Sequence, residues 1–302
     1  MPTRVLITGA KGMLGKDVAE VFSKDKKYQV FGTTRNKEAR KSKITYIQAD
    51  LTNAKETKRV LSKSKPDIII HCAAIVNLDM CEKNRKTTDL LHIKSTKSLS
   101  SYKNGSAKFI YISSDSVFNG KTGNYTELDK PDPLNYYAHS KQMGEQAALA
   151  NNKNSIVIRT NIYGFHVPPG NSLVEWALNN FVLKNKINGF TDVIFNPVYT
   201  KQLARTIKYI LENHGKIAGI LNIASTKPLS KYAFLRLLSK QFGFNQSLIR
   251  PASIDDSDLN TFRPKNTSLN TLKLRKILGK NRLTNIDGFA EIKKDYGNNF
   301  TK

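Results

Sequence analysis

The segment Thr8-Gly9-Ala10-Lys11-Gly12-Met13-Leu14-Gly15 decides the fold, because its glycines recur at the spacing G-x-x-G-x-x-G. The apolar, β-branched run Val5–Thr8 is typical of a buried strand, and Leu14–Phe22 has the pattern of an amphipathic helix. Side chains at Gly9 or Gly12 would hold the backbone away from a pyrophosphate, while the helix N-terminus supplies free N–H groups to it. We therefore predict a dinucleotide site here rather than a simple glycine turn.

Outward from this turn, the first half of the chain alternates strand-like and helix-like segments. The expected strands are Val30–Thr34, Thr45–Gln48, Asp67–Cys72 and Phe109–Ser113, and the expected helices are Lys55–Ser62 and Leu90–Ser101. Continuously apolar strands separated by helices predict a parallel sheet covered on both faces. The predicted fold class is α/β, a doubly wound parallel sheet of the Rossmann type with a smaller C-terminal lobe.

After Gly164 the pattern becomes less regular. We therefore expect residues 1–164 to form the dinucleotide-binding domain and residues 165–302 to form mainly a substrate-binding lobe. Leu173–Lys184 and Lys231–Phe242 are expected helices, and Ile220–Ala224 is expected to join the main sheet as a late strand. A cleft between two such lobes is the default ligand site.

The composition favours a soluble globular protein of a reducing compartment. Hydrophobic residues make up 39% of the 302 residues. The longest apolar run, from Ile68 to Val76, is far shorter than the roughly 20 residues that span a bilayer. We read no signal peptide at the N-terminus, and Cys72 and Cys81 do not make a disulfide framework. The expected location is the cytoplasm.

The net charge of +25 has two competing explanations. It could attract an anionic ligand, a nucleic acid or a membrane surface, or it could be spread over solvated faces. Lysines occur along the whole chain, and no helix-turn-helix, zinc-finger or RNA-binding signature accompanies them. We favour the dispersed charge, and we expect neither nucleic acid nor membrane as a partner.

Tyr137 and Lys141 form the pattern Tyr-x-x-x-Lys, which places both side chains on one face of a helix. The tyrosine could donate its phenolic proton to a substrate oxygen, while the lysine holds a ribose and its charge favours the phenolate. A tyrosine and a lysine with this spacing on a solvent-exposed helix face, without a catalytic role, would show the same sequence pattern. Tyr136 is a rival by adjacency, but only Tyr137 has the four-residue spacing to Lys141.

The setting of this pair resembles one family over nearly the whole chain. The glycine turn, the strand-end run Phe109–Gly120 and the segments 125–137 and 140–145 resemble the extended short-chain dehydrogenases/reductases, most closely the dTDP-4-dehydrorhamnose reductase branch. The resemblance implies NADP-dependent reduction of a 4-keto-6-deoxy nucleotide sugar in polysaccharide or deoxysugar biosynthesis. The expected partner is the nucleotide-sugar substrate, and a homodimer is an open expectation.

The resemblance also implies site residues. Ser114 would be the third catalytic group beside Tyr137 and Lys141, with Ser113 and Ser116 as alternatives. The substrate would meet Ser114, Asp115, Tyr137 and Arg263, the last at its diphosphate unless Arg263 only forms a structural ion pair. The cofactor would be bound by Gly9, Lys11, Gly12, Met13, Leu14, Gly15, Thr34, Arg35, Asp50, Leu51, Ala73, Ala74, Tyr137 and Lys141.

The end of the second strand predicts which nicotinamide cofactor binds. Sites that prefer NAD usually carry an acidic residue there, whereas this chain has Thr33, Thr34 and Arg35. A guanidinium can bind a 2′-phosphate through two hydrogen bonds, and a carboxylate would repel it. We expect NADPH, with NADH less favoured, unless Arg35 is only a solvated surface residue.

Two positions depart from the family pattern. His92 lies where the family usually carries an Asn that helps a proton-relay water, and it could serve a relay or be a half-buried polar residue. The family's Trp near the sugar is missing, and the one tryptophan, Trp176, could replace it or belong to the core. No metal is expected, because the remaining histidines show no metal-ligand spacing: His71, His139, His166 and His214.

Two other functions stay open at this point. A nucleotide-sugar epimerase or 4,6-dehydratase of the same superfamily would retain tightly bound NAD, and dehydratases usually add an acidic pair after the catalytic hydroxyl. Here only Asp115 is acidic, because Ser116 follows it. A regulatory, NADP-binding subunit of another enzyme would catalyse nothing, and the intact Ser114, Tyr137 and Lys141 argue against it.

Overall fold

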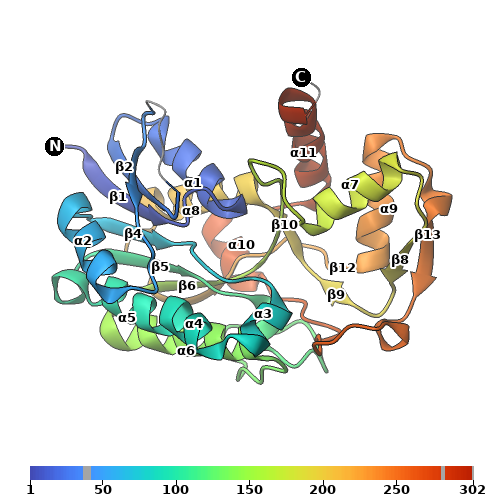
Figure 1. The fold of residues 1–302 in the computed structure, drawn as a ribbon, viewed down its shortest axis with the longest axis horizontal. Helices are drawn as coiled ribbons and strands as arrows, with labels where there is room; N and C mark the ends of the chain where they lie inside the picture. Colours follow the sequence, from blue (N-terminus) through green and yellow to red (C-terminus); the bar gives the residue numbers. More distant parts are fainter. Residues whose placement is uncertain (37–41, 280–282, 301–302) are drawn as a thin grey trace.

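Parallel strands form the central sheet of the computed structural model, which describes residues 1–36, 42–279 and 283–300. The strand order across the sheet is β11-β6-β5-β4-β1-β2-β3. The strand bounds are β1 Thr3–Thr8, β2 Tyr28–Thr34, β3 Thr45–Gln48, β4 Ile68–His71, β5 Lys108–Ile112, β6 Ile156–Arg159 and β11 Gly219–Asn222. An order that runs outward in both directions from β1 defines the doubly wound dinucleotide-binding fold. The predicted fold class is confirmed (Figure 1).

Helices cover both faces of this sheet, as continuously apolar strands require. On β1, Val5 and Ile7 belong to one hydrophobic core and Leu6 to another, because successive side chains of a strand point to opposite faces. The first core receives α1 (Met13–Ser23) and α8 (Thr200–Asn213). The second receives α2 (Ala54–Ser64), α5 (Ser95–Ser100) and α6 (Tyr136–Asn151).

The helix expected over Leu90–Ser101 is interrupted. Helix α3 (Leu78–Lys83) and helix α4 (Arg85–Asp89) lead into a π-helical turn, Leu90–Lys94, and α5 follows it directly. A π turn inserts one extra residue into a helix and often occurs at functional sites. Here it holds His92, whose side chain is buried.

A further hydrophobic core lies beside the sheet and belongs to what we call the smaller lobe (Figure 1, right). The lobe contains α7 (Leu173–Val182), α9 (Lys231–Phe242) and two short strand pairs. Strand β8 (Ile187–Phe190) pairs with β13 (Ile249–Ala252), and β9 (Ile194–Phe195) pairs with β12 (Leu229–Ser230). The core is rich in aromatic rings, among them Phe181, Phe195 and Phe234.

The chain crosses between the two parts more than once after residue 164. Strand β7 (Asn161–Tyr163) pairs with β10 (Pro197–Tyr199) at the junction, and α8 then returns to the main sheet. Helix α10 (Leu272–Leu278) packs on the same core, with Leu274 buried there. The late strand expected near Ile220 is present as β11, whereas the division at residue 164 stays a prediction.

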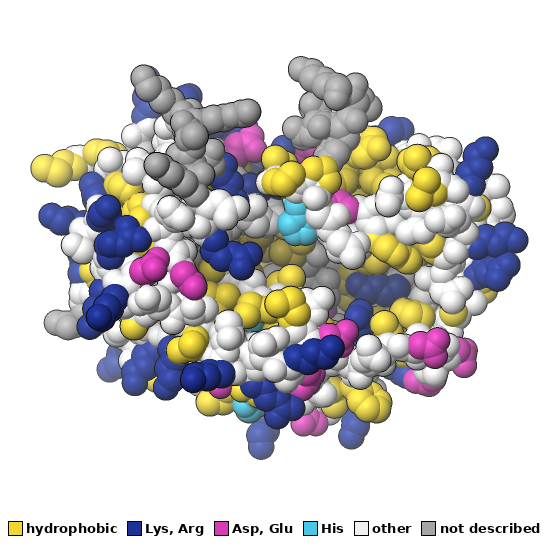
Figure 2. All heavy atoms as spheres, in the orientation of Figure 1, with side chains coloured by type: hydrophobic (Ala, Val, Ile, Leu, Met, Phe, Trp, Pro, Cys, Tyr) yellow, Lys and Arg dark blue, Asp and Glu magenta, His cyan; other side chains and the backbone are white. Residues whose placement is uncertain are grey.

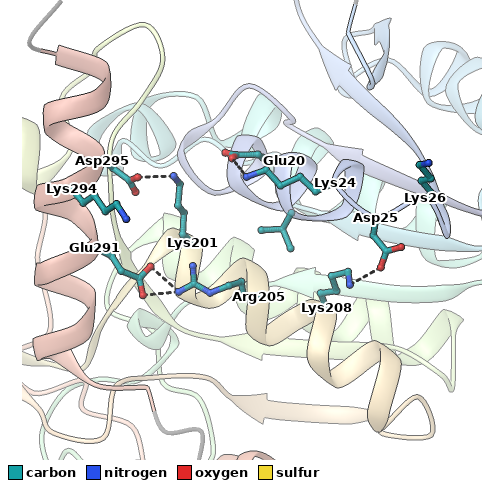
Figure 3. Close-up of a pocket in the computed structure, with 11 residues that line it drawn as sticks. Glu20, Lys24, Asp25, Lys26, Lys201, Arg205, Lys208, Glu291, Lys294 and Asp295 are labelled. Atoms are coloured by element: carbon teal, nitrogen blue, oxygen red, sulfur yellow. Dashed lines mark hydrogen bonds and ion pairs between the residues drawn. The ribbon is translucent and has the colours of Figure 1, made fainter.

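Helix α11 (Asn285–Phe300) connects to α8 through a ladder of ion pairs (Figure 3). Lys201 binds Asp295 at 2.8 Å and Arg205 binds Glu291 at 2.7 Å. The two cations are four residues apart on α8, and the two carboxylates are four residues apart on α11. These pairs line a charged groove at the C-terminal end of α1, which is the end opposite to the glycine turn. No helix of the described residues has the length and apolar character to cross a membrane.

Candidate active site

The glycine turn lies between β1 and α1 and is tightly packed. Gly9 has a φ of +62°, and a Cβ on it would lie 2.9 Å from the Cα of Ala73. A Cβ on Gly15 would lie 2.1 Å from the carbonyl oxygen of Gly9. Helix α1 begins after Gly12 without a side-chain cap and without an acidic residue in its first turn. Its first N–H groups are therefore left to an anion, as a pyrophosphate requires.

We predict that Gly15→Ala weakens the binding of a nicotinamide dinucleotide at least about tenfold, a cost of ~1.4 kcal/mol. The added methyl group collides with backbone atoms of the turn, so the turn must move. The measurement is a fluorescence titration of NADPH. Gly297→Ala is the control, because a Cβ there meets nothing within 4 Å. If wild type and Gly15→Ala bound NADPH with equal affinity, the glycine turn would not be the pyrophosphate site.

The other predicted cofactor residues gather at the same edge of the sheet. Parallel strands end at a common edge, so segments that follow β1, β2, β3 and β4 come together there. Arg35 and Asp50 line one hollow with Tyr46, and the ammonium of Lys11 lies 4.4 Å from the centre of the Tyr46 ring. The carboxylate of Asp50 accepts hydrogen bonds from the N–H and hydroxyl of Thr52, at 2.9 and 2.8 Å.

Tyr137 and Lys141 lie one turn apart on α6, close to the end of β5. Asn135 caps the helix by accepting the N–H of Ala138 at 2.9 Å. Lys141 is 2% exposed and donates from Nζ to the carbonyl of Ile112 at 2.6 Å. Burial lowers the pKa of Lys141 to about 7.

Burial also controls the pKa of the Tyr137 phenol. It raises the pKa of Tyr137 to about 12, and a hydrogen bond with the Ser114 side chain partly offsets this rise. We expected the charge of Lys141 to favour the phenolate, but desolvation of the phenolate dominates. The side chain of Tyr137 is therefore protonated at neutral pH.

The three candidate serines differ in whether they interact with the phenol of Tyr137. Ser113 donates to the carboxylate of Glu145 at 2.5 Å, and Ser116 donates to Asp115 at 3.3 Å. Ser114 lies against Tyr137 and accepts the N–H of Ser116 at 3.1 Å. Among these hydroxyls, the Ser114 hydroxyl is the one placed with the phenol.

His92 joins the strand-end loop after β4 to helix α6. Its Nε2 accepts the N–H of Ile75 at 2.9 Å, and its Nδ1 lies 2.8 Å from the hydroxyl of Ser140. That hydroxyl donates its single proton to the carbonyl of Tyr137, so His92 must donate from Nδ1. Burial lowers the pKa of His92 to about 2. A neutral imidazole with both nitrogens engaged favours a structural polar residue over a proton relay, but His92 is fully buried and not half-buried as expected.

Asp115 lies beneath Ser114 and is 1% exposed. Its Oδ2 accepts hydrogen bonds from Thr267 at 2.6 Å and from Asn161 at 2.9 Å. Burial raises the pKa of Asp115. The carboxylate therefore ties the end of β5 to the C-terminal part of the chain.

The predicted diphosphate residue, Arg263, is exposed and lines an outer hollow with Leu259 and Phe262. Trp176, on α7, is 36% exposed, so it is not a core residue.

Sequence reasoning missed Lys231, whose charge interacts with the charges of Asp115 and Arg263. A signal was present, because a lysine at a helix N-terminus opposes the helix dipole. Across the described residues, no His, Cys, Asp and Glu side chains cluster in a way that could hold a metal.

The fold and this edge of the sheet define an extended short-chain dehydrogenase/reductase. The family model described as RmlD substrate binding domain matches residues 3–296, and the chain belongs to that family. The resemblance to the dTDP-4-dehydrorhamnose reductase branch is confirmed by the family model and by solved structures.

The similar proteins include reductases and a protein subunit. A dTDP-4-dehydrorhamnose reductase from Bacillus anthracis in complex with NADP is 25% identical with a TM-score of 0.85, covering 98% of this chain and 100% of that one. Methionine adenosyltransferase 2 subunit beta of Xenopus tropicalis is 31% identical, over 91% of this chain and 82% of that protein. The spore coat polysaccharide biosynthesis protein SpsK of Bacillus subtilis is 29% identical, over 82% of each.

Proposed function

We propose that this chain reduces the keto group of a 4-keto-6-deoxy nucleotide sugar with NADPH, in polysaccharide or deoxysugar biosynthesis. The observation that carries the proposal is the meeting of Ser114, Tyr137 and Lys141 at the sheet edge where the glycine turn opens α1. The turn fits a dinucleotide, because its glycines leave no room for a Cβ and the N-terminus of α1 is uncapped. The likeness to the NADP-bound reductase supports a nicotinamide cofactor.

The bound cofactor supplies a hydride to the keto carbon. Tyr137 holds the proton that the keto oxygen needs, and its raised pKa keeps that proton in place at neutral pH. Ser114 orients and polarises the same oxygen from the end of β5. Lys141 would hold the cofactor ribose, and the residue itself is 2% exposed to water.

The substrate would lie between this edge and the smaller lobe. Figure 2 shows the surface hollowed between the two parts, with Lys or Arg side chains inside the hollow. Residues 165–302 then supply most of the substrate contacts, with Arg263 at the diphosphate. We further propose a cytoplasmic location, in line with the free Cys72 and Cys81, and a homodimer stays an open proposal.

We predict that the protein uses NADPH far better than NADH and that Arg35→Asp narrows or reverses this preference. The guanidinium attracts the 2′-phosphate, and a carboxylate in its place repels it. The measurement is kcat/KM with each cofactor, and we expect the ratio to change at least about tenfold, or ~1.4 kcal/mol. Arg250→Asp is the control, because Arg250 is exposed on β13 of the smaller lobe. Equal efficiency of the wild type with both cofactors would refute the assignment.

A regulatory subunit is the second candidate, favoured by the likeness to methionine adenosyltransferase 2 subunit beta. Such a subunit would bind NADP and leave a keto sugar unchanged. An epimerase or dehydratase would instead carry NAD through purification. The test is to identify the nucleotide released from the denatured protein, and then the sugar product formed with added NADPH. An exchangeable cofactor and a reduced product support the reductase, whereas retained NAD overturns it.

A further inference from the structure

Lys231 is a cation on the wall of the smaller lobe, close enough to Asp115 for the two charges to interact. It is the first residue of α9, directly after the capping Ser230, and its backbone N–H donates to the carbonyl of Val193 at 2.9 Å. Strands β12 and β9 pair just before it and fix this end of the helix. A cation at a helix N-terminus is unfavourable for the helix dipole. Helix stability therefore does not explain this residue.

The ammonium of Lys231 packs on an aromatic ring. Its Nζ lies 3.4 Å from the centre of the Phe195 ring, which is 1% exposed. Within the part of the chain that the structure describes, its side chain makes no hydrogen bond and no ion pair. Burial lowers the pKa of Lys231 to about 8, the charge of Asp115 acts against this, and the charge of Arg263 adds to it.

Asp115 does not neutralise Lys231 by direct contact, because its oxygens already have partners. Donors from four other side chains surround them: Thr267 at 2.6 Å, Asn161 at 2.9 Å, and Ser114 and Ser116 at 3.3 Å each. Lys231 is partly buried, and even partial withdrawal of an ammonium from water without a partner is costly. The wall therefore carries positive charge that an anionic ligand would compensate.

Arg263 provides a second cation farther out. Its side chain is exposed and lines the outer hollow. Lys231 instead packs on Phe195 of β9, whose neighbour Ile194 accepts the N–H of Thr267, and Thr267 donates to Asp115 beside Ser114. Lys231 thus lies toward the reacting end of the cleft and Arg263 toward the open surface. Two cations in this order match two phosphates in a row.

We propose that Lys231 binds the sugar-proximal phosphate of a nucleoside-diphosphate-linked substrate, while Arg263 meets the outer phosphate. The inference rests on the proposed function for the nature of the ligand. It adds the residue that distinguishes a diphosphate from a monophosphate. An ammonium is a compact charge and makes charge-assisted hydrogen bonds to phosphate oxygens.

The first test is calorimetry with NADPH at saturation, so that the cofactor's own pyrophosphate site is filled. The probes are UDP, dTDP, GDP and CDP, each beside its monophosphate. In Lys231→Gln we expect the best diphosphate to bind at least about tenfold more weakly and to lose its advantage over the monophosphate. Lys227→Gln, an exposed lysine in the loop before β12, should stay within about twofold of wild type.

The second test uses the wild-type protein and does not depend on a variant that folds. A limiting acylating reagent should modify the amine of Lys231, and mass spectrometry should show that the best diphosphate protects it while its monophosphate does not. Full labelling under saturating diphosphate, equal protection by the monophosphate, or no diphosphate binding beside NADPH would each overturn the proposal. If Lys231→Gln lost diphosphate affinity but the wild type showed no reductase activity, the proposed function would be refuted. The role of Lys231 in diphosphate binding would then still stand.

Discussion

Tyr137→Phe should lower kcat at least about 100-fold, a cost of ~2.7 kcal/mol, while NADPH binds within about threefold of wild type. Removing one oxygen leaves the ring in place beside His92, whose ring centre lies 6.0 Å away. The phenol gives its proton only as negative charge develops on the substrate oxygen, so its loss affects the transition state more than the ground state. The measurements are the steady-state rate and an NADPH titration.

The matched control is Tyr136→Phe, one residue earlier on α6. The hydroxyl of Tyr136 donates to Asp89 at 2.8 Å and is not part of the proposed site. We expect this variant to keep its rate within about threefold. A fall of less than about tenfold in Tyr137→Phe, or ~1.4 kcal/mol, would exclude Tyr137 as the acid.

Glu145→Ala should destabilise the protein by about 3–5 kcal/mol. The side chains of Arg159 and Glu145 are 1% and 4% exposed and are joined by hydrogen bonds at 2.8 and 3.0 Å. Removing the carboxylate leaves the guanidinium buried without its counter-charge, and Ser113 also loses its acceptor. The measurement is the free energy of unfolding in urea, followed by circular dichroism.

Glu20→Ala is the control for this loss, because it removes a carboxylate from an exposed pair. The side chains of Lys24 and Glu20 are 70% and 44% exposed, and Figure 3 shows their contact on α1. Water screens such a pair, so we expect a change of about 1 kcal/mol or less. If the two variants lost similar amounts of unfolding free energy, the buried pair would stabilise the protein no more than the exposed pair does.

The fold could be predicted because its signals are local. The glycine turn and the apolar strands appear in short windows of sequence, and helix α9 was predicted with the bounds Lys231–Phe242 that the structure has. The π turn could not be predicted, because it depends on packing. His92 is held there by Ile75, 17 residues earlier, and by Ser140, 48 residues later.

The candidate site was less accessible to sequence reasoning. Ser113 and Ser114 look alike in the sequence, and what separates them is a contact of Ser113 with Glu145, 32 residues away. The raised pKa of Tyr137 comes from burial, which the spacing to Lys141 does not report. Lys231 was missed because a lysine at a helix N-terminus does not by itself indicate a ligand, and the surroundings of Lys231 are assembled from distant segments.

The most direct measurement is NADPH consumption by the purified protein, without a partner, on a panel of 4-keto-6-deoxy sugars linked to different nucleoside diphosphates. We predict that at least one substrate is reduced at a rate that Tyr137→Phe lowers at least about 100-fold. If the protein binds NADPH tightly and consumes none of it with any member of the panel, the chain is not the reductase proposed.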